Sequence, residues 1–474
     1  MSSFTISPTL NKDKVFILNL SQVEHRLDPN FYRQIFKDNI EKIKANNYKR
    51  IGEVVKFSNE TWNQKDFFSS TFPYIEISEI DTLSGDIKNL SEVDIADAPS
   101  RAKMIVREND IIVSTTRPNR GAISFVKREN DFSIASTGFA VIRSLTTEEF
   151  DKEYLFAVLR QKFSLLQLEQ RSSGGNYPAI TQDELSNVVI PIPNKSIQEK
   201  VKAIFNTCFE LKSKNEATAA NILRSIDTYL LQELGITLPT PPENILTNRM
   251  FTVSMNEISG KRFDPAYHQV YFHKLVASIV NSKYKSRRIG EEINEINYGA
   301  SFTNDYVESG VPLLRIKDLR RNEIVIDKVV FLPEIARKLL GNSFVKQNDF
   351  LISRSGTIGV VSLVSKEIDG FAFGSFMIKF NLKSDKVLNR EFLSYYLNCK
   401  LLIDLIERDK IGAIQGNITI PIIKSLLVPV PPLDKQKEIA DHITGIRKQA
   451  QQLKDKTKEL LKKASEEIEE ILLN

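Results

Sequence analysis

The residue types that carry most enzyme chemistry are few and scattered in this chain. Metal sites built from cysteine and histidine need these residues in short, paired spacings, and no such spacing occurs here. The six residues concerned are His25, His268, His273, His442, Cys208 and Cys399. We therefore expect each to be a surface or packing residue, and we predict no metal site.

No motif for methylation, nuclease cleavage or nucleotide hydrolysis is found either. An adenine methyltransferase would need Asn or Asp before Pro-Pro and an aromatic residue, together with a glycine-rich loop, whereas Thr240-Pro241-Pro242-Glu243 is typical of a linker. Asp86-Ile87-Lys88 lacks the second carboxylate that a nuclease metal requires. No phosphate-binding loop is present. We predict no catalytic residue and no cofactor in this chain; the alternative is a DNA-modifying enzyme with an unrecognised site.

Basic and polar side chains in turns could instead contact DNA. The first candidates are Thr115, Thr116, Arg117, Asn119 and Arg120 before Gly121, and Arg354, Ser355 and Thr357 around Gly356. Arginine in a glycine-containing turn can reach guanine with two hydrogen bonds, or a phosphate, although a solvated loop arginine explains any one of them equally well. Short basic clusters add Lys103, Arg107, Arg315, Lys317, Arg320 and Arg321, for which phosphate contact is the expected role.

Three aromatic residues near these turns could wedge against bases, but aromatic residues beside strands are more often core. They are Trp62, Phe67 and Phe68. We expect a packing role for them.

The bulk composition is that of a folded protein in water. Hydrophobic residues make up 41% and charged residues 26%, and the net charge of +5 is only weak evidence for nucleic acid. No apolar run approaches the roughly 18 residues that span a bilayer, and the N-terminus lacks a secretory signal. We expect a cytoplasmic protein without membrane contact.

The sequence contains an internal repeat. Arg26-Leu27-Asp28-Pro29 returns as Arg262-Phe263-Asp264-Pro265, and Ile190-Pro191-Ile192-Pro193 returns as Val428-Pro429-Val430-Pro431; Gln198 aligns with Gln436. These and further matches keep one order at an offset of 236 to 239 residues. Two unrelated domains with common turn patterns are the alternative, but a repeat is the better interpretation.

Each half begins with a mixed globular part and ends with a long helix. Short β-rich runs such as 110–114 and 350–353 alternate with turns, and helical patterns occur around 153–167 and 390–407. We therefore predict an α+β fold with two pseudo-repeated mixed α/β domains and two long helices that form an antiparallel coiled coil. The expected boundaries are 1–193 and 250–431 for the domains, 194–235 and 432–474 for the helices, and 236–249 for the linker.

The two helices each carry a single narrow apolar stripe with three-four spacing. In the first helix the stripe contains Ile197, Val201, Ile204, Cys208, Leu211, Ala219, Ile222, Ile226 and Tyr229, and in the second Ile439, Ile443, Ile446, Ala450, Leu453, Leu460, Ala464, Ile468 and Ile471. Asn215 and Thr457 are the polar members. A helix of about 38 residues, on the order of 57 Å long, needs a partner; mutual pairing is the simplest solution, and pairing with another protein is the rival.

The order of these parts resembles the specificity subunit of type I restriction-modification systems. The resemblance covers nearly the whole chain, and it is strongest at NYPAITQDELSNVVIPIPNKSIQEK (176–200) and GNITIPIIKSLLVPVPPLDKQKEI (416–439). It implies two target-recognition domains, each reading half of a bipartite site on double-stranded DNA, and paired helices that hold them at a fixed separation. Because the two halves agree in framework but differ between framework motifs, the full site should be asymmetric.

The same resemblance implies a prokaryotic, nucleoid-associated protein with several partners. Two methyltransferase subunits would dock on the helices, and restriction subunits would add translocation and cleavage, so S-adenosylmethionine, ATP and Mg²⁺ are expected on the partner subunits only. The remaining alternative is a coiled-coil scaffold whose globular domains bind protein.

Overall fold

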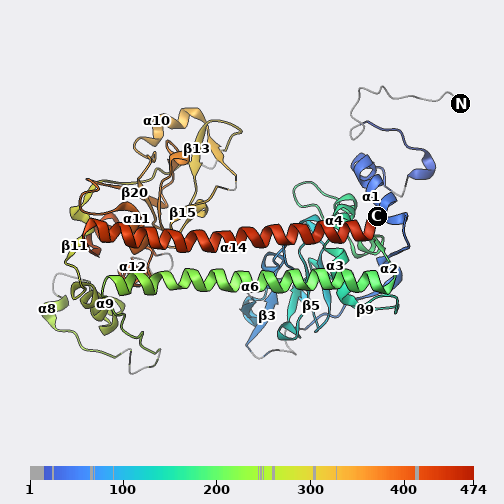
Figure 1. Ribbon diagram of the computed structural model, residues 1–474, viewed down its shortest axis with the longest axis horizontal. Helices are drawn as coiled ribbons and strands as arrows, with labels where there is room; N and C mark the ends of the chain where they lie inside the picture. The colour runs from blue at the N-terminus through green and yellow to red at the C-terminus, as the bar shows by residue number, and fades with distance from the viewer. Residues whose placement is uncertain are drawn as a thin grey trace. The chain divides into compact units, whose positions relative to one another are not determined.

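The computed structural model describes residues 15–23, 26–63, 68, 70–88, 90–243, 245, 248, 250–258, 262–302, 306–326, 328–410 and 416–474 (Figure 1). They form two compact units. Unit 1 comprises the described residues up to Ala217 together with Leu453–Asn474, and unit 2 comprises those of Thr218–Gln452. Each unit contains one globular part, called head 1 or head 2 below, and segments of both long helices.

Head 1 is built on two four-stranded sheets. The first has the order β2 (Val55–Ser58), β9 (Phe139–Leu145), β6 (Ile111–Ser114), β7 (Ile123–Phe125) and is antiparallel; the second has the order β4 (Ser91–Asp94), β3 (Thr71–Ile75), β8 (Ile134–Ser136), β5 (Ala102–Ile105), with β3 and β8 parallel. A separate antiparallel pair joins β1 (Tyr48–Arg50) to β10 (Val189–Pro191). β6 is one of the two inner strands of the first sheet, and all four of its residues are buried.

The helices of head 1 cover these sheets. They are α1 (Gln34–Lys44), α2 (Ile51–Val54), α3 (Lys152–Leu159), α4 (Lys162–Arg171) and α5 (Gln182–Ser186), with 3₁₀ turns at Leu20–Gln22, Pro29–Tyr32, Ile77–Glu79, Ile95–Asp97, Pro118–Arg120 and Arg128–Asn130. The helical pattern at 153–167 is thus two helices. Gln161 is extended between them, and it accepts a 2.8 Å hydrogen bond from the hydroxyl of Ser465 on the C-terminal helix.

Head 2 repeats this arrangement. Its main sheet has the order β12 (Ile293–Tyr298), β20 (Met377–Leu382), β17 (Phe350–Ser353), β18 (Val361–Leu363); the smaller sheets are β16 (Val330–Leu332), β13 (Val311–Leu314), β19 (Ala372–Phe373), the pair β14 (Leu319–Arg320) and β15 (Glu323–Ile324), and the pair β11 (Ser286–Arg288) and β21 (Leu427–Pro429). The order β12-β20-β17-β18 matches β2-β9-β6-β7 strand for strand. The repeat expected from the sequence is therefore confirmed in the topology.

The helices of head 2 follow the same scheme. They are α8 (Met255–Ile258), α9 (Val270–Val280), α10 (Arg337–Leu340), α11 (Arg390–Leu397), α12 (Lys400–Asp409) and α13 (Ile420–Ser425), with 3₁₀ turns at Pro265–His268, Ile289–Glu291, Ile316–Asp318, Glu334–Ala336 and Lys366–Ile368. The pattern at 390–407 is again split, here between Leu397 and Lys400.

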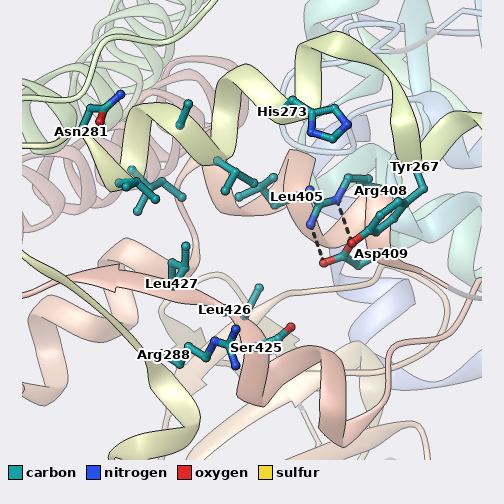
Figure 2. A pocket seen from close by; sticks show the side chains of 14 residues that line it. Tyr267, His273, Asn281, Arg288, Leu405, Arg408, Asp409, Ser425, Leu426 and Leu427 are labelled. Atoms are coloured by element: carbon teal, nitrogen blue, oxygen red, sulfur yellow. Dashed lines mark hydrogen bonds and ion pairs between the residues drawn. The ribbon is translucent and has the colours of Figure 1, made fainter. Parts of the chain in front are cut away.

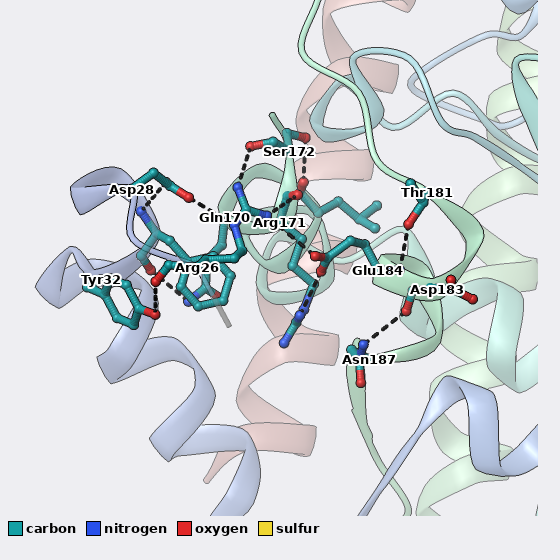
Figure 3. Close-up of polar contacts among 12 residues, drawn as sticks. Arg26, Asp28, Tyr32, Gln170, Arg171, Ser172, Thr181, Asp183, Glu184 and Asn187 are labelled. Carbon is teal, nitrogen blue, oxygen red and sulfur yellow. Dashed lines mark hydrogen bonds and ion pairs between the residues drawn. The ribbon is translucent and has the colours of Figure 1, made fainter. Parts of the chain in front are cut away.

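In head 1, the side chain of Arg26 joins two segments that lie 145 residues apart in the sequence (Figure 3). We call this set of contacts the arginine clamp. Arg26 Nε pairs with Asp28 at 2.9 Å, and its Nη1 donates to the carbonyl of Arg171 at 2.7 Å. The hydroxyl of Tyr32 donates to the carbonyl of Arg26 at 2.7 Å. The clamp ties the segment before α1 to the end of α4.

Head 2 contains the same clamp. Arg262 Nε pairs with Asp264 at 2.7 Å, and its Nη1 donates to the carbonyl of Asp409 at 2.8 Å. His268 takes the place of the tyrosine, with its Nε2 2.6 Å from the carbonyl of Arg262. The Arg-x-Asp-Pro match in the sequence therefore marks one structural device used twice.

The two longest helices are α6 (Lys195–Glu233) and α14 (Leu433–Leu473), green and red in Figure 1. Within unit 1, Val201 of α6 shares a core with Ile468 and Leu472 of α14. Asn215 Nδ2 donates to Thr457 Oγ1 at 3.1 Å, so the polar members of the two stripes face each other. A polar pair of this kind fixes the register of paired helices.

Within unit 2 the helices meet again in the same sense. The rings of Tyr229 and His442 lie 4.1 Å apart, and Lys435 Nζ pairs with Glu233 at 2.7 Å. In both units, rising numbers in α6 meet falling numbers in α14. The expected antiparallel pairing is therefore present in each unit.

One position of the expected stripe is wrong. Leu211 is 40% exposed, while its neighbour Lys212 is 4% exposed. Lys212 Nζ lies 2.8 Å from Glu216, 3.4 Å from Asp86 and 3.8 Å from Asp81. Burial acts to lower the pKa of Lys212, but these carboxylates outweigh it and hold the pKa above its usual range. The acidic turn of head 1, which contains Asp81 and Asp86, therefore favours burial of Lys212, whereas the spacing favoured burial of Leu211.

A buried glutamine secures the start of each long helix. Gln198 Nε2 donates to the carbonyls of Pro193 at 2.8 Å and Glu149 at 3.0 Å. Gln436 Nε2 does the same with Pro431 at 2.8 Å and with Val387 at 2.9 Å. Each amide thus joins a long helix to two loops of its own head.

Gln436 is fully buried, and its Oε1 also accepts a 2.8 Å hydrogen bond from the backbone of Asn389. Because Gln436→Leu removes the partner of the Pro431 and Val387 carbonyls and of the Asn389 N–H, we expect it to lower the free energy of unfolding of unit 2 by about 2–4 kcal/mol. Gln452→Leu, at an exposed position of α14, is the control and should change little. Urea denaturation measures both; equal losses for the two variants would contradict this role.

Candidate nucleic-acid interface

The loop that follows β6 in head 1 is held from both sides by backbone hydrogen bonds. Thr115 donates its N–H to Gly138 at 2.7 Å and accepts a 2.8 Å bond from Ile180. Thr116 pairs with Ala179 in an isolated bridge. The loop is therefore a fixed platform at the end of a buried strand.

Arg117 has an unusual conformation in this loop. Its backbone is left-handed, with φ 48° and ψ 50°. Residues other than glycine adopt this conformation only at a cost in free energy. Its N–H donates to Pro178 at 2.6 Å, and its Nη2 donates to the carbonyl of Asn176 at 2.7 Å. The guanidinium lies 4.2 Å from the ring centroid of Tyr177.

These partners belong to a short hairpin, residues 173–179, whose second half begins the 176–200 passage that carries the family resemblance but was not among the expected DNA contacts. Ser173 and Ala179 exchange hydrogen bonds of 2.9 and 2.8 Å, and Gly174 has φ +100°. Tyr177 is 70% exposed. The run Gly174-Gly175-Asn176 is a turn signal that could have drawn attention to it.

The remaining candidates of the loop are open to solvent. Asn119 and Arg120 are exposed on the 3₁₀ turn that follows Arg117. A cavity of about 480 Å³ adjoins both segments and is lined by Asn119, Gly174 and Arg33, among others. Head 1 thus presents the 115–121 loop and the 173–179 hairpin as one surface of basic, amide and aromatic groups.

The corresponding loop of head 2 differs in detail. Arg354 donates its N–H to Phe376 at 2.8 Å and accepts a 3.1 Å bond from Ile418. These are the bonds that Thr115 makes in head 1. Arg354 therefore occupies the position of Thr115, and Arg117 has no arginine counterpart.

The side chain of Arg354 lies over an aromatic ring all the same. Its guanidinium is 4.8 Å from the ring centroid of Tyr298 on β12, and its buried Nε has no hydrogen-bond partner among the residues that the structure describes. Ser355 is buried and bonds Asn417, whereas Thr357 is exposed. Of the three candidates, Thr357 is the most open to a ligand.

Two expected phosphate contacts are engaged in the protein itself. Arg107 Nη2 lies 2.6 Å from Glu60, and its guanidinium lies 4.2 Å from the ring of Phe132. Arg315 Nε lies 3.0 Å from the buried carboxylate of Asp318. Both guanidinium groups satisfy internal carboxylates, so the structure gives them a framework role. By contrast, Lys103, Lys317, Arg320 and Arg321 are exposed.

Two of the three aromatic candidates, Trp62 and Phe68, have the packing role expected of them. Trp62 is 7% exposed and donates Nε1–H to Ala102 at 2.6 Å, and Phe68 packs against it with ring centroids 5.5 Å apart. Phe67 lies outside the described residues.

Head 2 contains a cavity of about 570 Å³ (Figure 2). It is lined by apolar side chains such as Val276 and Leu405 and by one acidic group, Asp409. Arg408 Nε lies 2.7 Å from this carboxylate, and its guanidinium lies 4.7 Å from the ring of Tyr267. The carboxylate is thus held in an ion pair inside its own head.

The nuclease-like Asp86 and Lys88 are also ion-paired, with Lys127 at 3.1 Å and Asp81 at 2.7 Å. In the part of the chain that the structure describes, no three His, Cys, Asp or Glu side chains gather as a metal site would require. Over the same residues, no helix has the length and apolar character to cross a membrane.

Comparison with known proteins accounts for this combination. The family model of the type I restriction modification DNA specificity domain matches residues 44–224 and again residues 281–463. The chain therefore belongs to the type I restriction-modification DNA specificity family, and its function is that of a specificity subunit. The resemblance seen in the sequence is confirmed.

Individual relatives are distant. The type I restriction enzyme MjaVIII specificity subunit of Methanocaldococcus jannaschii is 24% identical over 376 residues, which cover 78% of this chain and 80% of the relative. The HindI specificity subunit of Haemophilus influenzae is 21% identical over 335 residues, 60% and 70% of the two chains. A solved HsdS subunit from Thermoanaerobacter tengcongensis is 23% identical, with a TM-score of 0.35 over 90% of this chain and 96% of the other.

The framework role of Arg107 can be tested by pH. Its hydrogen bond is the first cause that lowers the pKa of Glu60 from 4.5, so the ion pair stabilises head 1 above that value and is lost as pH falls through the lower folded pKa. Because Glu60 is 36% exposed, we expect Arg107→Gln to cost about 0.5–1 kcal/mol at pH 7 and less in acid. Lys103→Gln is the control. A penalty that persists unchanged in acid would exclude the ion pair as its cause.

Proposed function

We propose that this chain reads two different DNA half-sites, one with each head, and carries no catalytic group of its own. The observation that supports this most strongly is the contrast between framework and loops. The heads share strand order, arginine clamp and buried glutamine, yet the loops after the equivalent strands β6 and β17 differ in residues and in hydrogen bonding. Identical readers would select identical half-sites, so these heads should select an asymmetric site.

The chemistry of the loops suits duplex DNA. Arginine and amide side chains can read base edges in the major groove, and exposed lysine or arginine binds phosphate. On head 1 these groups are Arg117, Asn119, Arg120 and Lys103. On head 2 they are Arg354, Lys317, Arg320 and Arg321. The phosphate contacts position the protein, and the loop residues discriminate sequence.

The helices α6 and α14 would set the spacing of the heads and dock two methyltransferase subunits, and restriction subunits would join that complex. The relatives are named as specificity subunits of type I restriction enzymes, which supports such an assembly. S-adenosylmethionine, ATP and Mg²⁺ would then be bound by the partners. The carboxylates of Asp86 and Asp409 are ion-paired within their own units, which is consistent with a chain that leaves catalysis to others.

The experiment that tests this function is a genome-wide map of methylated adenines in the source cell, with and without the gene. We expect one bipartite, asymmetric motif to disappear without the gene and to return when the gene is restored. An unchanged map in a cell whose methyltransferase subunit is expressed would contradict the proposal.

Reading and assembly should be separable by mutation. We expect Arg117→Glu or Arg354→Glu to weaken DNA binding by the methyltransferase complex roughly tenfold or more, because each replaces a favourable charge near phosphate by a repulsive one. Ile222→Asp, which places a charge in the half-buried stripe of α6, should instead impair assembly. Gel-shift and pull-down assays on the same variants measure the two effects; the reverse assignment would contradict the division between loops and helices.

A further inference from the structure

Tyr177 belongs to the head 1 surface, and its side chain was not among the expected DNA contacts. It lies in the 173–179 hairpin, is 70% exposed, and covers the guanidinium of Arg117 at 4.2 Å. One exposed aromatic residue by itself needs no explanation. The contact of Tyr177 with Arg117, whose backbone is left-handed, does need one.

The left-handed backbone of Arg117 is maintained by this hairpin. The N–H of Arg117 donates to Pro178 and its Nη2 to Asn176, the two residues that flank Tyr177. A side chain other than glycine in this region costs roughly 1–2 kcal/mol, and such strain persists where the surrounding structure enforces it, often at ligand-binding sites. The hairpin thus holds an arginine in a conformation that the chain alone would avoid.

The stacking leaves most of the guanidinium donors for a ligand. Arginine has five N–H donors in a fixed plane, and among the described residues only one hydrogen bond of the Arg117 guanidinium is found, that to Asn176. An aromatic face fixes this plane without consuming a donor. The guanidinium of Arg117 is therefore oriented for the bidentate hydrogen bonding that guanine or phosphate accepts.

Head 2 reaches the same combination from different elements. Arg354 takes the backbone position of Thr115, and its aromatic partner, Tyr298, comes from β12 and is 40% exposed. The repeat of the chain does not explain this pairing, because neither residue aligns with its functional counterpart. An arginine held on a tyrosine is therefore a property of both loop surfaces in its own right.

We propose that Tyr177 is a specificity-determining residue of head 1: it fixes the guanidinium plane of Arg117 and offers its open face to the sugar and bases of one DNA half-site. This inference rests on the proposed function, since it assumes that head 1 reads DNA. Neighbouring Asn119 and Arg120 supply the amide and positive charge that the same duplex would meet.

The test replaces the gene in the source cell by variants and maps methylated adenines by single-molecule sequencing. For Tyr177→Leu we expect the preference for the intact motif over single-base mismatches to fall about tenfold in one half of the site, with the other half unchanged. Tyr177→Phe should retain the wild-type preference because it keeps the ring. Tyr48→Leu is a control, since Tyr48 is 39% exposed on head 1 but lies beneath Lys44 instead of an arginine.

The outcomes are distinct. Unchanged discrimination in Tyr177→Leu, an equal loss in both halves, or the same loss in Tyr177→Phe would each overturn the role of the ring. A melting midpoint of purified Tyr177→Leu within about 2 °C of wild type, as expected for an exposed position, excludes misfolding as the cause. Failure of the proposed function would show earlier, as a wild-type gene on which no bipartite motif depends.

Discussion

A long helix with one narrow apolar stripe is not stable by itself in water, and this chain contains two. Each unit meets that constraint by combining a head with segments from both helices. In unit 1, Ile468 and Leu472 of α14 lie in the same core as Val201 of α6. In unit 2, Leu230 and Leu231 of α6 lie in the same core as Ile439 of α14. The long helices therefore supply part of the hydrophobic core of each unit. The buried amides of Gln198 and Gln436 fix where each helix leaves its head.

This arrangement separates the parts that must stay constant from those that can change. The arginine clamps, the glutamine anchors and the central sheets are the same in both heads, and they lie in the framework of each domain. The loops after β6 and β17 are held at their ends by equivalent backbone bonds but contain different side chains. A recognition surface can diverge on such a framework because its substitution leaves the buried hydrogen bonds untouched.

The features that could be predicted from the sequence are those that depend on the helical spacing of apolar residues and on the internal repeat. The repeat, the mixed heads, the two helices and the polar positions Asn215 and Thr457 could all be read from spacing, and the structure adds that the last two bond each other. Prediction failed where a distant partner decides. Leu211 had the right spacing for burial, but the acidic turn of head 1 places Lys212 inside instead.

The candidate site shows the same division. Arg107 was a reasonable phosphate ligand from its sequence context, but its guanidinium pairs with Glu60, 47 residues earlier in the chain, and no local pattern reveals that contact. Asp318, by contrast, lies only three residues after Arg315, so this ion pair was within reach of sequence reasoning. Tyr177 was missed for the same reason as Glu60: its significance lies in a contact with Arg117, 60 residues earlier in the chain.

The composition of unit 1 has a consequence for biosynthesis. Unit 2 is one continuous stretch, Thr218–Gln452, whereas unit 1 needs Leu453–Asn474 in addition to residues made before unit 2 began. On the ribosome, head 1 therefore emerges first but must wait, with the binding face for Ile468 and Leu472 uncovered, until the whole of unit 2 has been translated. The half of the protein that is made first is the last to be finished, and during that interval its uncovered core is where a chaperone would be expected to bind.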